Sequence, residues 1–148
     1  MTKRIALSLL AVILLFSFAS CSKSGYPDLP WDAIKFEYTD YMAKPGLYYS
    51  SIKWGDRVYL PYAYADGEIK ADYVTDCLGY TSYNGEDSKN ERVFTIKGDG
   101  EHNFLLIMTV GTKTAARPQI FRALDSKGKN VFDPGYPQER NYDDVWKD

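Results

Sequence analysis

The chain has 148 residues, among them 13 Tyr, 7 Phe and 3 Trp, and its 18 Lys and Arg stand against 20 Asp and Glu. This aromatic and apolar content excludes a disordered chain, because disordered chains lack the apolar area that offsets the entropy of ordering. The net charge of −2 argues against nucleic-acid binding or anionic-lipid binding as the main function, since both need clustered Lys and Arg.

The first residues have the pattern of a secretory signal peptide. Lys3 and Arg4 precede an apolar stretch, residues 5–19, that only Ser8 and Ser17 interrupt. As a helix this stretch would extend about 22 Å, which is less than the ~30 Å hydrocarbon core of a bilayer. The sequence therefore favours a cleaved signal over a permanent membrane span.

The apolar stretch ends in Phe18-Ala19-Ser20-Cys21, which resembles the signal sequence of bacterial lipoproteins. The resemblance implies that residues 1–20 are removed and that Cys21 becomes the first residue, with a diacylglyceryl thioether and an acylated amino group. Two or three acyl chains anchor a protein stably. We therefore expect an extracytoplasmic protein held at the cell membrane by the lipid on Cys21. An ordinary secretory signal beside an incidental cysteine is the alternative.

The resemblance also predicts how the rest of the chain is organised. Ser22 after the lipidated cysteine implies the outer membrane in a cell that has two membranes. Residues 21–30 are expected to be the lipidated N-terminus and a flexible linker, because their side chains cannot build a core. Residues 31–148 have the length of one domain. Within that domain Cys77 is the only cysteine, so no internal disulfide is expected.

Apolar residues of the domain alternate with period two, which predicts strands. We expect strands at 34–38, 47–54, 57–64, 69–75, 78–83, 91–97, 103–110 and 119–124, and at most a short helix within 138–146. The first of these also has a helical alternative, since Trp31, Ile34, Tyr38 and Tyr41 fall at helical spacing. Together they predict a single all-β domain: a small antiparallel β-barrel or sandwich of about seven strands with a mostly irregular C-terminal tail.

The strands at 47–54 and 57–64 form the clearest predicted hairpin. Gly55 comes first in a two-residue loop, which suits a type II′ turn and sets the register. One face then carries Tyr48, Ile52, Trp54 and Tyr59, with Arg57 opposite Trp54 at cation–π distance. Tyr, Trp and Arg are enriched at binding hot spots, so this face is the candidate partner-binding site. The alternative is that the face packs against the rest of the domain.

The strand at 103–110 is apolar on both faces, which is typical of a central strand covered on two sides. The tail can supply the outer cover with Phe132, Tyr136, Tyr142 and Trp146. An uncovered partner surface is the alternative.

No catalytic constellation is recognisable. His102 is the only histidine and is expected in an exposed turn, and no GxSxG motif surrounds a serine. Cys77 has no basic neighbour to lower its pKa and is expected to be a small buried residue, with a reactive thiol as the alternative. We therefore predict no enzymatic activity.

Metal and nucleotide sites are not expected either. One histidine and one free cysteine exclude the usual closed zinc site. The acidic loops at 66–68 and 84–87 lack EF-hand spacing and are expected to be solvated turns. Since no P-loop or GxGxxG motif follows a strand, we expect no metal, cofactor, nucleotide or nucleic acid.

These observations predict a membrane-tethered lipoprotein that acts as a binding or assembly module. Its partner would be an envelope protein or glycan. The alternatives are a β-barrel that carries a small ligand, and a small envelope enzyme or enzyme inhibitor whose site is assembled only in the fold.

Overall fold

The computed structural model describes residues 25–112, 116–135, 138–139 and 142–147, and within these ranges the protein is all-β. The expected signal peptide, the lipidation site Cys21, Ser22 and Tyr136 lie outside the described residues. The strands are β1 (Ile34–Glu37), β2 (Thr39–Lys44), β3 (Leu47–Trp54), β4 (Arg57–Ala65), β5 (Val74–Tyr83), β6 (Glu86–Ile96), β7 (Phe104–Thr109), β8 (Gln119–Ala123) and β9 (Gln138–Glu139). The described residues also include three short helical segments: η1 (Ala71–Tyr73), η2 (Leu124–Ser126) and α2 (Asp143–Trp146). In the described part of the chain no helix is both long and apolar enough to cross a bilayer.

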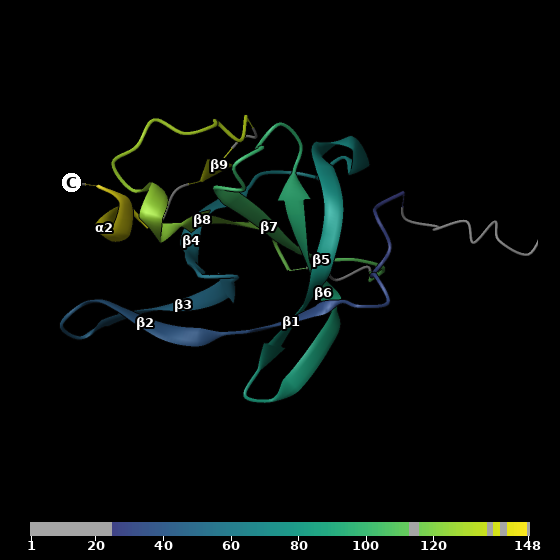
Figure 1. The fold of residues 1–148 in the computed structure, drawn as a ribbon, viewed down its shortest axis with the longest axis horizontal. Coiled ribbons are helices and arrows are strands. Elements are labelled where there is room, and N and C mark those ends of the chain that lie inside the picture. Colours follow the sequence, from purple (N-terminus) through teal and green to yellow (C-terminus); the bar gives the residue numbers. More distant parts are fainter. Residues whose placement is uncertain (1–24, 113–115, 136–137, 140–141, 148) are drawn as a thin grey trace, which may run out of the picture.

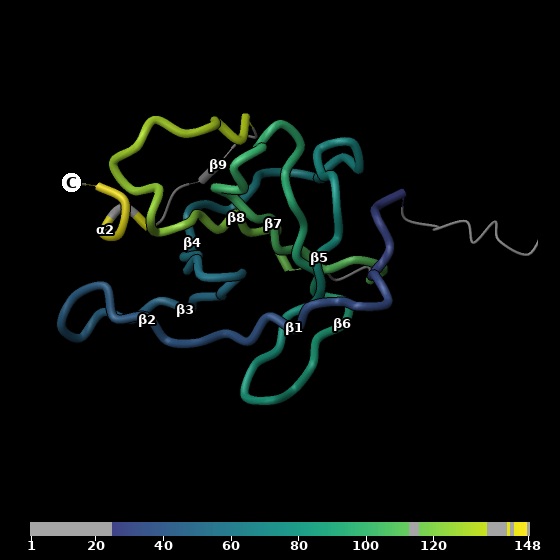
Figure 2. The backbone as a smooth tube through the Cα atoms, viewed as in Figure 1, coloured from purple at the N-terminus to yellow at the C-terminus, as the bar shows by residue number. Residues whose placement is uncertain are grey.

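The strands form one curled sheet in the order β1-β5-β6-β7-β8-β4-β3-β2, with β9 paired to β4 (Figures 1 and 2). The two end strands, β1 and β2, are consecutive pieces of chain separated only by Tyr38. Up to that residue the chain pairs with β5, and the Tyr38 amide still donates to the Ser82 carbonyl at 2.9 Å. From Thr39 onward it pairs with β3. The sheet therefore curls into a half-barrel whose two ends are joined by a single continuous segment.

The all-β prediction is confirmed, but two of its details are corrected. One pairing is parallel, because β1 runs in the same direction as β5. The number of strands is also higher than expected, since β2 and β9 were not predicted and the stretch 69–75 forms η1 followed by the start of β5. The helical alternative for 34–38 is wrong, because Ile34–Glu37 is a strand.

Three of the hairpins have two-residue turns. Gly55 has φ +58° while Asp56 has no positive φ, which agrees with the expected type II′ turn between β3 and β4. Gly46, with φ +80°, follows Pro45 in the turn from β2 to β3. Asn84 and Gly85, with φ +51° and +82°, connect β5 to β6. This last pair matches the Asn-Gly signature of a type I′ hairpin turn, so the expected acidic loop at 84–87 is part of a long hairpin.

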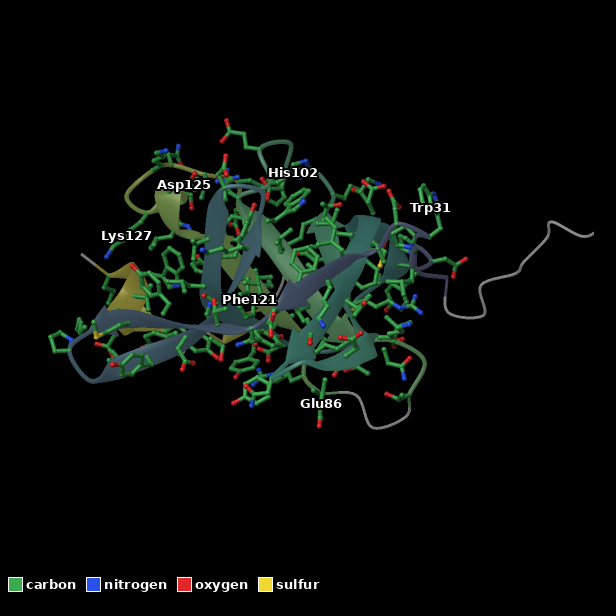
Figure 3. All side chains as sticks on the ribbon, turned by 60° about the horizontal axis from the view of Figure 1, so that its bottom comes forward. Trp31, Glu86, His102, Phe121, Asp125 and Lys127 are labelled. Atoms are coloured by element: carbon green, nitrogen blue, oxygen red, sulfur yellow. The ribbon has the colours of Figure 1, made fainter. Side chains whose placement is uncertain are left out.

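The inner face of the curled sheet carries one apolar core. Its buried members come from opposite sides of the curl: Phe36, Ile52, Tyr59, Val93, Leu105, Ile107, Phe121 and Ala123. Figure 3 shows Phe121 at the centre of the molecule, between the ribbons. These side chains fill the inside of the half-barrel.

The outer face of the sheet carries a second core, which the tail covers. Leu106 and Met108 of β7 belong to this core, whereas Leu105 and Ile107 belong to the inner one. Phe132 and Trp146 pack against it, as do Tyr26 and Leu29 from the N-terminal side. The expectation that the side chains of residues 21–30 take no part in a core is therefore wrong for these two residues. The Trp146 indole also donates to the Pro61 carbonyl at 2.7 Å. The expected two-sided burial of this strand and its cover by the tail are thus confirmed for Phe132 and Trp146.

Candidate functional site

The five residues of the expected partner-binding face do not share an exposed surface. Ile52 and Tyr59 are 0% exposed, Tyr48 is 58% exposed, and Trp54 and Arg57 are half-buried. The register is confirmed next to the turn, where Ile52 pairs with Tyr59 and Trp54 pairs with Arg57, but the expected pairing does not continue to Ser50 and Tyr48, because β3 leaves β4 there and pairs with β2. The sheet curls toward this face, however, and turns it into the filled interior. Ile52 and Tyr59 are therefore corrected to core residues, and Trp54 packs against that core, in agreement with the alternative that the face packs within the domain, whereas Tyr48 stays exposed.

Arg57 is a structural residue that holds a loop in place. Its guanidinium donates to the Asp125 carboxylate at 2.8 Å, to the carbonyls of Glu101 and His102 and to Asn103 Oδ1. The hydrogen bond to Asp125 raises the pKa of Arg57, and the same bond lowers the pKa of the Asp125 carboxyl. The guanidinium carbon lies 5.6 Å from the centre of the Tyr59 ring. The expected cation–π contact is therefore made with Tyr59, and Trp54 packs against the His102 ring instead.

His102 and Cys77 are both placed against the body of the fold. His102 has φ +51°, and its ring centroid lies 5.1 Å from that of Trp54, so the side chain is half-buried, not exposed as expected. Its Nδ1 is buried and has no hydrogen-bond partner among the described residues. Cys77 is a buried free thiol in the outer core, and burial raises its pKa. The interpretation of Cys77 as a small buried residue agrees with this environment.

The acidic loops do not converge on a cation site. Asp87 lies beside Lys35, with its carboxylate 3.0 Å from the ammonium group. Asp66 pairs with Arg117. Among the described residues no group of three or more His, Cys, Asp and Glu side chains is placed to hold a metal ion.

The concavity that best suits a ligand opens at one end of the half-barrel, where β3 and β4 separate. Their pairing stops at Ile52 and Tyr59; beyond that point β3 pairs with β2 while β4 pairs with β8 and β9. The resulting pocket has a volume of about 540 Å³. Its lining residues are Tyr38, Tyr48, Tyr49, Ser50, Pro61, Tyr64, Thr81, Tyr83, Ser88, Glu91, Gln119, Phe121 and Tyr142. We call it the tyrosine pocket, because six of these residues are tyrosines.

Two hydrogen-bond networks order the polar groups of the tyrosine pocket. In the first, the Tyr38 hydroxyl donates to Glu91 Oε1 at 3.0 Å, and the Thr81 hydroxyl donates to the same oxygen at 2.5 Å. In the second, the Gln119 amide donates to the Tyr142 hydroxyl at 2.6 Å, which in turn lies 2.9 Å from the Tyr64 hydroxyl. The carboxylate and the amide are therefore held in fixed positions on the pocket wall.

The aromatic rings of the pocket are arranged as a packed wall and an open rim. The Tyr142 ring packs edge-on against Tyr49 at 5.8 Å and lies 5.9 Å from Tyr64. Tyr48 on β3 and Tyr83 on β5 are 58% and 62% exposed. These two rings stand at the rim, ready for contact with a bound molecule.

The lining of the tyrosine pocket is nearly uncharged. Among the described residues that line it, Glu91 alone carries a formal charge at neutral pH. Burial, followed by the charge of Glu91, raises the pKa of Tyr38. Burial also raises the pKa of Tyr142. Both hydroxyls therefore stay protonated at neutral pH and can donate hydrogen bonds.

A larger hollow, about 650 Å³, lies between the β2–β3 hairpin and α2. Its charged lining consists of Lys44, Lys127, Asp144 and Lys147. All four residues are exposed, and Lys44 is paired with Asp144 at 3.4 Å. Exposed charged side chains are well hydrated and interact only weakly with one another or with a ligand. The tyrosine pocket is therefore the stronger candidate.

Comparison of the chain with protein-family models, with curated proteins and with solved structures found no match. The candidate site therefore stands on the residues of this chain alone.

Of the five residues expected to bind a partner, only Tyr48 lines the tyrosine pocket. For the other lining residues the sequence contains one local signal, the Asn84-Gly85 turn. This turn joins the long strands β5 and β6 and so places Tyr83 and Ser88 at the rim of the pocket. The convergence of Tyr38, Glu91 and Gln119 depends on the curl of the sheet and has no local sequence signal.

Proposed function

We propose that this chain is a membrane-tethered extracytoplasmic lipoprotein that acts as a binding module for an envelope component. The tyrosine pocket is its binding site, and the lipid on Cys21 holds it at the membrane, the outer one where the cell has two. The single observation that carries the binding role is the convergence of six tyrosines around Glu91 and Gln119 at the open end of the half-barrel.

The shape of the pocket supports a ligand that enters a concave site. Small-molecule sites in proteins usually enclose about 300 to 1,000 Å³ and combine apolar walls with a few fixed polar groups. The tyrosine pocket, with a volume of about 540 Å³, lies within this range and combines aromatic rings with fixed polar groups. One segment of an envelope polymer fits this description better than a flat protein surface does.

The filled inner core argues against the alternative of a carrier that encloses a small ligand. Tyr59, Phe121 and Leu105 are no more than 1% exposed and occupy the space inside the half-barrel. A small barrel encloses a ligand only when its own side chains leave an internal cavity. Binding at the open rim is compatible with this packing.

The binding role is tested by photo-crosslinking in the cell with a probe amino acid at position 83. Tyr83 is 62% exposed at the rim of the pocket, so the probe leaves the fold intact. The matched control carries the probe at position 31, where Trp31 is 97% exposed and lies away from the pocket. We expect an adduct from position 83 that position 31 does not form. Equal adducts from both positions would refute the pocket as the binding site.

The anchor is tested separately with Cys21→Ser. We expect this change to block acylation and cleavage, so that the precursor keeps residues 1–20. Gel mobility and membrane fractionation report both effects. A variant that stays at the membrane at its mature size would rule out the lipoprotein assignment without bearing on the pocket.

A further inference from the structure

We infer that the ligand of the tyrosine pocket is a neutral carbohydrate chain, an inference that rests on the proposed binding function. The argument has three parts: the charge of the lining, the exposed aromatic faces, and the fixed hydrogen-bonding groups. Each comes from a different set of side chains.

The charge of the lining excludes an acidic ligand. Phosphate, carboxylate and sulfate groups are bound through Lys, Arg or clustered backbone amides. The described lining contains no Lys and no Arg, and its one charge is the carboxylate of Glu91. An anionic ligand would be repelled by that carboxylate, and the Arg117 guanidinium, which lies 5.3 Å from the centre of the Tyr64 ring, is already paired with Asp66. The ligand that fits is neutral or cationic.

The exposed aromatic rings match the flat, partly apolar faces of sugar rings. Tyr48 on β3 and Tyr83 on β5 stand on different strands around the pocket, and each is more than half exposed. A tyrosine ring offers an apolar face and a polar tip, and a pyranose ring offers an apolar C–H face edged by hydroxyls. Two such rings on one open pocket suit successive units of a chain.

The fixed polar groups match the hydroxyls of a sugar. Glu91 accepts hydrogen bonds from Tyr38 and Thr81 through Oε1, and no described side chain donates to its Oε2. Gln119 uses its amide nitrogen on Tyr142, which leaves the amide oxygen as an acceptor. Ser50 and Ser88 add hydroxyls that donate and accept. This set presents acceptors and donors side by side, as the recognition of a polyhydroxyl ligand requires.

A quaternary ammonium group is the competing ligand, because aromatic cages with a carboxylate also bind such cations. The arrangement of Glu91 favours the carbohydrate. The two hydroxyl donors on its Oε1 disperse part of its negative charge, and the two exposed rings are carried by separate strands. A quaternary ammonium group binds best where several exposed aromatic faces surround one point.

The test is calorimetric titration of the mature lipidated protein, residues 21–148, in micelles of a neutral polyoxyethylene detergent, which contain no sugar, no quaternary ammonium group and no net charge. The probes are hexasaccharides of glucose, mannose, galactose and N-acetylglucosamine. Hexagalacturonate serves as the acidic match of the galactose chain, and choline chloride serves as the cation probe.

We expect at least one neutral hexasaccharide to bind and hexagalacturonate to bind at least about tenfold more weakly than that sugar. Tyr48→Ala and Tyr83→Ala should each weaken the binding about tenfold, the effect of removing a hot-spot aromatic residue. Trp31→Ala removes an even more exposed aromatic residue, one outside the pocket, and should leave the affinity unchanged. Thermal unfolding of each variant checks that the fold is retained.

Three results would overturn the inference: choline binding in place of sugar, hexagalacturonate binding more tightly than the neutral chains, or no saccharide binding at all. Retention of sugar affinity in both Tyr48→Ala and Tyr83→Ala would do the same. If position 83 still crosslinks to an envelope component in cells while no sugar binds, the proposed function stands and the carbohydrate assignment alone fails.

Discussion

Gly79 on β5 lies so close to Ile34 on β1 that a Cβ atom at position 79 would stand 1.9 Å from the Ile34 carbonyl oxygen. This contact is where the parallel pairing of β1 and β5 closes the half-barrel, with Ile34 and Gly79 as register partners. The atoms that a side chain would meet belong to the backbone and cannot swing aside. Only glycine allows the approach.

We therefore expect Gly79→Ala to displace β1 and destabilise the protein by about 2 to 3 kcal/mol, the upper range for inserting a methyl group into a packed site. Urea unfolding measures the change. Gly100→Ala is the matched control, because a Cβ at position 100 meets no atom within 4 Å and the residue has no positive φ. Equal stability of the two variants would show that the close approach does not constrain position 79.

We expect Tyr59 to stabilise the fold and not to bind a partner. Its ring is fully buried and its hydroxyl donates to the His102 carbonyl at 2.8 Å. Tyr59→Phe should lower the free energy of unfolding by about 1 kcal/mol through the lost hydrogen bond, and Tyr59→Ala by about 3 to 5 kcal/mol through the cavity. Chemical denaturation checks both values. Tyr48→Ala, at an exposed position, should change stability by less than about 0.5 kcal/mol.

Combining Trp54→Ala with Tyr59→Ala should leave the protein unfolded or only marginally folded. The combined loss approaches the whole free energy of unfolding of a domain this size, typically about 5 to 15 kcal/mol. Circular dichroism and proteolysis report the state of the chain. A folded double variant that lost only binding would restore the first hairpin as the binding face.

The strands that sequence predicts well are those with local signals. The β3–β4 hairpin follows from alternating residues around Gly55, and the turn and the register up to the Ile52–Tyr59 pair agree with the structure. Which face of the hairpin is buried cannot be predicted in the same way. Both faces of β4 carry large side chains, and Tyr59 and Leu60, adjacent in sequence, are both 0% exposed. Alternation cannot choose between two buried faces.

The candidate site could not be predicted from the sequence, because the curvature of the sheet is what brings its residues together. Tyr38 and Glu91 are 53 residues apart and meet only because β1 returns to pair with β5. Parallel pairing of a short strand across a long separation has no local signature. In the sequence Tyr38 belongs to a segment that fits either strand alternation or helical spacing. Tyr38 lies between β1 and β2, where the chain changes its pairing partner from β5 to β3, and this position depends on how the whole sheet curls.

The pair of Arg57 and Asp125 predicts an acid dependence of stability. Arg57 lowers the pKa of the Asp125 carboxyl in the folded protein. The charged carboxylate is therefore more stable in the folded protein than in the unfolded chain. The contribution is present above the unfolded pKa of about 3.9 and is lost as the pH falls through the lower folded value. The Asp125 side chain is 57% exposed, so the effect should stay below about 1 kcal/mol.

This acid dependence is measured by urea unfolding of the wild type and of Asp125→Asn. The wild type should be more stable at pH 7, and the difference should shrink toward zero near pH 2. Asp56→Asn, in an exposed turn outside the Arg57 contacts, is the control. A difference that persists unchanged at low pH would mean that the carboxylate charge is not what Arg57 recognises.

Tyr38 predicts the opposite dependence at alkaline pH. Burial and the charge of Glu91 raise the pKa of its hydroxyl in the folded protein, so the folded state binds this proton more tightly than the unfolded chain. The stability that follows is complete below the unfolded pKa of about 10 and is lost as the pH rises toward the folded value. Stability should therefore decline above about pH 10 by this route.

Absorbance of tyrosinate at alkaline pH measures the ionisation directly. We expect Tyr38→Phe to leave the absorbance of the folded protein at pH 10 unchanged, because Tyr38 is still protonated there. Glu91→Gln removes the negative charge beside the hydroxyl, so Tyr38 should begin to ionise at a lower pH than in the wild type. If Tyr38→Phe instead removes the absorbance of one tyrosinate at pH 10, the hydroxyl is not held as a donor to Glu91. The fixed network on the pocket wall would then lose its main support.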